Sequence, residues 1–134
     1  MTQSIQGRER VRYSIDKGRG LIVNTAEGCV KFDDIKDHQD RLLADYKFDV
    51  SFDQLIDTTG AIRFDMSDGE ARILAERPIV SPESRRAFVA IKPHIFGLGR
   101  MMEIYHESLG YADCQVFYSM DQAFNWLERQ QENI

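Results

Sequence analysis

Cysteine and positive charge are both scarce in this sequence, and no stretch is apolar over the length of a membrane span. The two cysteines, Cys29 and Cys114, lie far apart in apolar surroundings, where cysteine usually behaves as a small buried hydrophobe. A single disulfide between them is one alternative, and a reducing compartment is the simpler one. Residues 1–12 are polar and lack the apolar core of a signal peptide. We therefore expect a cytoplasmic protein with no membrane span.

Lysine and arginine together number 17, against 22 aspartates and glutamates, and the net charge is −5. A protein that binds nucleic acid normally carries a surplus of basic side chains, because these displace the counterions of the phosphates. The charge balance therefore argues against a nucleic-acid partner.

The usual signatures of catalysis and of metal binding are also missing. The sequence has no Gly-x-Ser-x-Gly elbow, no Cys-x-x-Cys and no Walker loop. Glu103 and His106 have the spacing of one half of a carboxylate di-metal site, but the second Glu-x-x-His that this chemistry needs is absent. We interpret His38, with Asp34 and Asp37 nearby, as part of an exposed mixed-charge helix face. We expect no enzymatic activity, no cofactor and no metal.

The length and the hydrophobic pattern both predict one α/β domain. A chain of 134 residues is about one domain long, and no linker or repeat divides it, so residues 1–134 are treated as a single unit. Period-2 and apolar runs predict strands at 10–15, 21–26, 54–57, 86–91 and 113–118. Helical patterns alternate with them in the order β-β-α-β-α-β-α-β-α. This order predicts a single-layer, mixed, mainly parallel sheet with an antiparallel N-terminal hairpin and four helices.

Glycines and threonines mark the strand ends. The segment 16–20 contains two glycines and predicts the turn of the hairpin. Glu27-Gly28 either breaks the second strand or continues it as a short extension through Val30. The third strand ends in Thr58-Thr59-Gly60, and residues 61–64 either lie outside it or continue it after a break. The run 86–91 is continuously apolar after its first residue, which is typical of a central strand covered on both faces.

The first two helices have start signals. Asp33 or Asp34 can open the first, since an acidic group suits the positive end of a helix. An apolar face follows at helical spacing, made of Ile35, Leu42, Leu43 and Tyr46. The second helix spans 67–76.

Ser67 is the expected N-cap of that second helix, and Glu70 three residues later completes a capping box. Ile73 and Leu74 are expected to face inward. A third helix is predicted at about 95–109, stopped by Gly110, and a last helix follows a second capping box at Ser119.

The segment Gly97-Leu98-Gly99-Arg100 is the best candidate for an anion site. Free amide groups at a helix start, together with an arginine, can hold a phosphate or a carboxylate. However, the dinucleotide fingerprint needs a third glycine at the position of Met102. Close packing of the helix on the sheet is the alternative that we favour.

Two further features admit two interpretations. The third helix carries more apolar side chains than one buried stripe needs, so its excess surface can form a homodimer contact or line an apolar groove. A wide core-facing helix is the simpler alternative. Arg85-Arg86 precedes the central strand, and we interpret it as a solvated strand entry.

The segment 55–74 (LIDTTGAIRFDMSDGEARIL) resembles the central signature of STAS domains, the family of anti-sigma-factor antagonists. In that family a strand ends in an acidic or amide residue, and Asp-Ser-x-Gly then opens a helix. By spacing, Asp57 matches the strand end and Asp65 the second Asp. Met66 occupies the phosphoacceptor position, followed by Ser67. The whole chain is similar to a divergent bacterial, SpoIIAA-like branch.

The resemblance implies a regulatory module that binds a protein partner, with a homodimer as one form, without the usual phosphoacceptor serine. Its candidate contact residues are Asp65 and Ser67. The alternative is a small-molecule or lipid-binding domain that uses the cleft beside the second and third helices. In that case Gly97, Gly99 and Arg100 would contact an anionic group.

Overall fold

Within residues 9–111 and 113–132, the part that the computed structural model describes, five strands form one sheet in the order β1-β2-β3-β4-β5. The strands are β1 (Val11–Asp16), β2 (Leu21–Lys31), β3 (Asp53–Asp65), β4 (Arg85–Val89) and β5 (Asp113–Phe117). Strands β1 and β2 are antiparallel, and all other neighbours are parallel. The predicted mixed, mainly parallel sheet with an N-terminal hairpin is confirmed.

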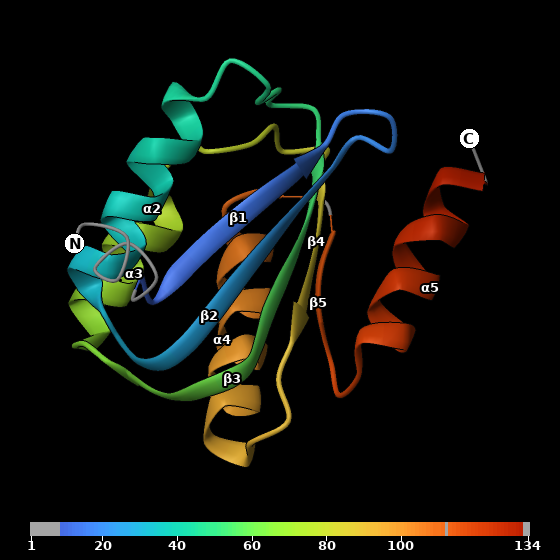
Figure 1. The fold of residues 1–134 in the computed structure, drawn as a ribbon. Helices are drawn as coiled ribbons and strands as arrows, with labels where there is room; N and C mark the ends of the chain where they lie inside the picture. The colour runs from blue at the N-terminus through green and yellow to red at the C-terminus, as the bar shows by residue number, and fades with distance from the viewer. Residues whose placement is uncertain (1–8, 112, 133–134) are drawn as a thin grey trace.

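In the described residues, four helices cover the sheet in the predicted order: α2 (Phe32–Ala44), α3 (Asp68–Glu76), α4 (Pro93–Ser108) and α5 (Met120–Glu132). Helices α2, α3 and α4 lie on one face of the sheet, and α5 lies on the other (Figure 1). The helices α2, α3 and α4 each follow a parallel strand closely, so their N-termini lie at the carboxyl edge of the sheet.

Strands β2 and β3 are longer than the sequence predicts. Gly28 takes φ +72° inside β2, a conformation that glycine tolerates, and the strand continues past it with register shifts. Thr58-Thr59-Gly60 is not the end of β3, because Thr58 is buried and its hydroxyl donates to the carbonyl of Val89 at 2.6 Å. Gly60 pairs with Glu27 in the ladder. The extension of each strand, one of two alternatives from the sequence, is the correct one.

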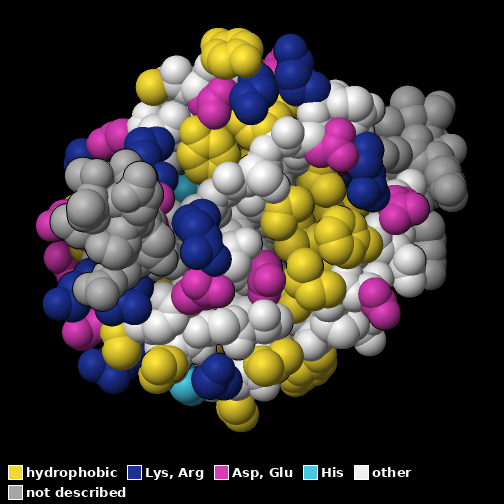
Figure 2. All heavy atoms as spheres, in the orientation of Figure 1, with side chains coloured by type: hydrophobic (Ala, Val, Ile, Leu, Met, Phe, Trp, Pro, Cys, Tyr) yellow, Lys and Arg dark blue, Asp and Glu magenta, His cyan; other side chains and the backbone are white. Residues whose placement is uncertain are grey.

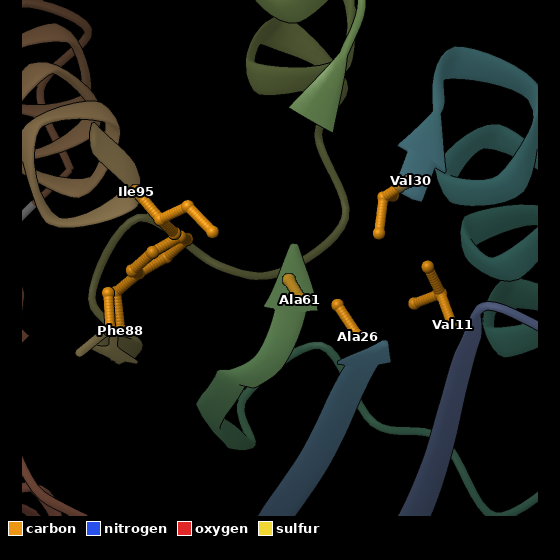
Figure 3. Close-up of a cluster of buried hydrophobic side chains, with 7 residues drawn as sticks. Val11, Ala26, Val30, Ala61, Phe88 and Ile95 are labelled. Atoms are coloured by element: carbon orange, nitrogen blue, oxygen red, sulfur yellow. The ribbon is translucent and has the colours of Figure 1, made fainter. Parts of the chain in front are cut away.

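Strand β4 is shorter than predicted, ending at Val89, and Ile91 is exposed beyond it. It still lies between β3 and β5, with helices on both faces. Phe88 belongs to a cluster with Ile95 of α4 on one side (Figure 3). Val89 packs with Ala123 of α5 on the other. The expectation of a strand covered on both faces is therefore correct.

The capping box of α3 is confirmed. The Ser67 hydroxyl accepts a hydrogen bond from the Glu70 amide at 3.1 Å, and the Glu70 carboxylate accepts one from the Ser67 amide at 3.0 Å. The predicted inward face of α3, Ile73 and Leu74, is correct for Leu74, which is buried with Ala75, and wrong for Ile73, which is exposed.

The face of α2 also differs from the prediction. The helix begins at Phe32, and Asp34 accepts a hydrogen bond from the Lys31 amide at 2.8 Å. Leu42 is buried, but Leu43 is exposed. Tyr46 lies beyond the helix end and is also exposed. The inward position is instead taken by His38, which the sequence analysis had placed on an exposed face. The helix is rotated so that His38 and Leu42, four residues apart, share the buried side.

The sheet and α5 enclose the second core cluster, which contains Leu21, Leu55 and Leu127. Hydrophobic side chains also reach the surface where the strands meet α5 (Figure 2). The partly buried members of this cluster are Val23, Phe117, Met120, Phe124 and Trp126. Among the described residues, no helix is long and apolar enough to cross a bilayer.

Candidate functional site

A cavity of about 170 Å³ lies between the sheet and the layer of α2, α3 and α4. Its walls are mostly apolar, with side chains such as Ile56, Phe88, Leu98 and Met102. Among the described residues, no aspartate or glutamate lines it. This is the cleft beside the second and third helices of the sequence analysis, extended to the buried side of α2.

The floor of the cavity carries a row of polar side chains that crosses four strands. Gln54 of β3, Arg86 of β4 and Cys114 of β5 are direct neighbours in the sheet register, so they share one face. Asn24 of β2 joins them, because its amide donates to the Gln54 side-chain oxygen at 2.7 Å. All four line the cavity. The register of the parallel strands thus places polar atoms beneath an apolar space.

Arg86 is the most unusual member of this row. Only 6% of the residue is exposed, and within the described part of the chain no carboxylate lies within ion-pair distance of its guanidinium. Nη1 donates to Nε2 of His106 at 2.6 Å, and the group lies 4.4 Å from the centre of the Tyr111 ring. Nε has no hydrogen-bond partner. Burial lowers the pKa of Arg86, but a guanidinium stays charged in proteins.

His106 holds Arg86 from helix α4. Its Nδ1 lies 3.0 Å from the Met102 carbonyl, which has only lone pairs to offer, so Nδ1 carries the proton and donates. Nε2 is then the acceptor for Arg86. Burial, and next the Arg86 charge, lower the pKa of His106 to about 4, so the ring is neutral at physiological pH. Burial also raises the pKa of the Cys114 thiol to about 11. Among the described residues of the floor, Arg86 therefore carries a charge that no carboxylate balances.

The opposite wall carries a second histidine and a second arginine. His38 of α2 is buried, its Nδ1 has no partner, and burial followed by the charge of Arg41 lowers its pKa to about 4. Arg77 follows α3 and is neutralised, because it reaches Asp40 at 2.6 Å and Gln39 at 2.8 Å. These bonds tie the end of α3 to α2.

The structure places the candidate residues of the β3–α3 segment at the protein surface. Asp65 ends β3 and is exposed, and Ser67 is exposed as the cap of α3. Met66 between them is half-buried and lines the cavity. The position that the resemblance assigns to a phosphoacceptor is therefore a cavity wall here.

The three residues of the anion hypothesis do not share one side of helix α4, because Gly99 is buried while Gly97 and Arg100 are exposed. Helix α4 begins at Pro93, so Gly97 and Gly99 lie inside the helix and not at its start, where amides lack helical partners. A Cβ on Gly99 would meet Val116 at 2.8 Å and Phe88 at 2.9 Å, whereas Gly97 faces open space. Close packing is thus the role of Gly99. Arg100 is exposed beside Glu103, at 3.6 Å.

Sequence reasoning missed Arg86 and His106. The interpretation of Arg85-Arg86 as a solvated strand entry is wrong, because Arg86 is buried and Arg85 is largely buried in an ion pair with Asp53 at 3.6 Å. Two signals were available. Arg86 alternates in step with Phe88, so it shares the face that α4 covers. His106 follows Met102 by four residues, at helical spacing on the buried side. Because arginine and histidine are usually solvated, the residue types favoured an exposed position over the buried one that this spacing indicates.

The described residues supply no grouping of three or more metal-ligating side chains. What the arrangement can do is enclose a small molecule against an apolar wall and meet it with one guanidinium.

This layout of a mixed five-stranded sheet with helices on both faces is a SpoIIAA-like α/β fold. The chain is similar to the crystal structure of an uncharacterised protein of the DUF3478 family, described as having a SpoIIAA-like fold, from Shewanella loihica PV-4. The TM-score is 0.58 at 16% sequence identity, over 87% of this chain and 93% of that one. No protein-family model and no curated protein matched the sequence. At this identity the likeness concerns the fold.

Proposed function

We propose that this chain is a non-enzymatic module that binds a small, mostly apolar molecule between its sheet and helices α2, α3 and α4. The observation that supports this is the cavity of about 170 Å³ with apolar walls and a polar floor. Its volume is similar to the roughly 150 Å³ of an engineered cavity that takes up benzene.

The space is partly open, so a ligand that enters it exchanges water for contacts with the apolar lining residues. This exchange favours the binding of an apolar molecule.

The side chains around the cavity favour binding over catalysis. The Cys114 thiol, with its pKa near 11, stays protonated and is a poor nucleophile. His106 is held by Arg86 and the Met102 carbonyl, so neither ring nitrogen is left for proton transfer. These groups orient and neutralise each other.

The test is binding of 1-hexanol, followed by two-dimensional NMR of the methyl groups. We expect shifts at Met66, Met102 and Leu98, which line the cavity. Ala71→Leu, at a half-buried cavity position of α3, should fill the space and abolish them. Ala44→Leu, at an exposed position of α2, is the matched control and should bind as the wild type does. Equal binding by both variants would contradict the assignment of the cavity.

A second candidate function, a regulatory module that binds a protein partner or a second copy, has its own observation. Helices α3 and α4 are neighbours, since Tyr105 bonds to Glu76 at 2.5 Å. They leave large apolar side chains in solvent: Ile73 on α3, and Met101 and Ile104 on α4. Sedimentation equilibrium tests the homodimer, and a monomer at high micromolar concentration would remove it.

A further inference from the structure

The buried charge of Arg86 is unbalanced within the described residues. Burying a cation without a counter-ion is unfavourable, and other buried charges of this domain have partners. Arg77, which also lines the cavity, is paired with Asp40. The partly buried Arg85 is paired with Asp53. Within the described residues, Arg86 has a neutral imidazole and the ring and hydroxyl of Tyr111, but no carboxylate.

The guanidinium also keeps unused hydrogen-bond capacity. Nη1 donates to His106, the guanidinium also forms a hydrogen bond with Tyr111, and Nε has no partner. An arginine presents its donors in a planar fork that fits the two oxygens of a carboxylate. Since Arg86 lines the cavity, an occupant of the cavity is in a position to meet this fork.

The charge balance sets the charge of the occupant. Burial keeps His106 and His38 neutral, and the Cys114 thiol is protonated. Arg77 is paired with Asp40, a carboxylate that also pairs with Lys36. Among the described lining residues, Arg86 is then the cation without a carboxylate partner, so the matching ligand is a monoanion. A phosphate dianion would bring a second negative charge for which these lining residues hold no further unpaired cation.

Resting on the proposed function, we propose that the ligand is a small monocarboxylate whose carboxylate binds Arg86 and whose apolar body, about as large as a hexyl chain or a benzene ring, fills the cavity. Arg86 is then the specificity-determining residue of the site. His106 is a positioning residue, because it holds the guanidinium through Nη1 while its own tautomer is fixed by the Met102 carbonyl.

Calorimetric titration of the wild-type chain with hexanoate and with 1-hexanol tests the proposal. The two probes share the apolar body and differ in the charged head. We expect hexanoate to bind at least about tenfold more tightly, since hydrogen bonds to charged groups are about twice as strong as neutral ones. Hexadecanoate, which has the same head on a chain too long for the volume, should bind no more tightly than hexanoate.

Arg86→Met should lose the preference for hexanoate and still bind 1-hexanol. Arg100→Gln is the matched control, because it removes an exposed arginine of α4 that does not line the cavity, and it should keep the preference. Replacing an unpaired buried charge by an apolar chain is expected to be tolerated by the fold. Should Arg86→Met not fold, the Nε–H resonance of Arg86 in the wild type decides. Hexanoate should shift it and 1-hexanol should not.

The outcomes separate the two proposals. If 1-hexanol binds as tightly as hexanoate, or Arg86→Met keeps the preference, the carboxylate assignment is wrong and the cavity function stands. If the wild type binds neither probe, both are wrong. If hexadecanoate binds far more tightly than hexanoate, the ligand is a long acyl chain and the size limit is wrong.

Discussion

Two buried neutral histidines make the folded state sensitive to mild acid. His38 and His106 both have a folded-state pKa of about 4, against an ordinary value of 6.5. The unfolded chain therefore binds more protons than the folded one between these values. Stability is complete above pH 6.5, falls as the pH is lowered through the window, and reaches its full loss below about pH 4.

The magnitude follows from the shift. At about pH 5, a group with these two pKa values costs about 2 kcal/mol of stability relative to neutral pH. The two histidines together cost about 4 kcal/mol, if their separate sites act independently. Several carboxylates also have lowered pKa values, including Asp40, Asp45 and Asp49. Their ordinary pKa is already near 4, so their loss falls mainly below this window.

Urea unfolding at about pH 5 and about pH 7.5 measures the difference. His38→Gln and His106→Gln, each neutral at every pH, should halve it, whatever their effect on absolute stability. The reasoning is refuted if the wild type is equally stable at both pH values, or if neither variant changes the difference.

Further predictions concern folding, capping and association. Phe88→Asp should leave the domain unfolded, because it buries an unpaired carboxylate at a cost of several kcal/mol. The control Phe88→Leu should unfold at a much higher temperature than Phe88→Asp. A wild-type melting temperature for Phe88→Asp would contradict this prediction. Ser67→Ala should cost about 1 kcal/mol in thermal unfolding, as lost caps do, and leave partner binding unchanged. Phosphorylation of Ser67 that switches binding would reverse that interpretation. Ile104→Glu on α4, where 67% of Ile104 is exposed, should dissociate a homodimer in sedimentation without lowering the melting temperature.

The order of the elements could be predicted because it depends on local periodicity. The capping box of Ser67 and Glu70 predicts the start of α3 from four residues, and the apolar run through Val89 predicts a strand covered on both faces. The length of β3 could not be predicted in this way. Thr58-Thr59-Gly60 has the composition of a turn, and it is extended only because the Val89 carbonyl accepts from Thr58 and β2 pairs alongside.

The candidate site was harder to predict for a similar reason. Asp65, Ser67 and Arg100 were chosen for their chemistry and lie at the surface. Arg86 became notable only once the register set it beside Gln54 and the helix packing set His106 above it. Whether a charged side chain is solvated or buried is decided by the other layer of the fold, which a linear pattern does not contain.

Gly99 sets how closely α4 approaches the sheet, since a single added carbon would meet Val116 and Phe88 below 3.0 Å. The same helix carries Leu98 and Met102 over the cavity. A methyl group at position 99 would therefore press on Val116 and Phe88, and α4 or these side chains must move to admit it. A substitution at position 99, which does not line the cavity, would then change the size of molecule that fits. The charged group that Arg86 binds would stay the same.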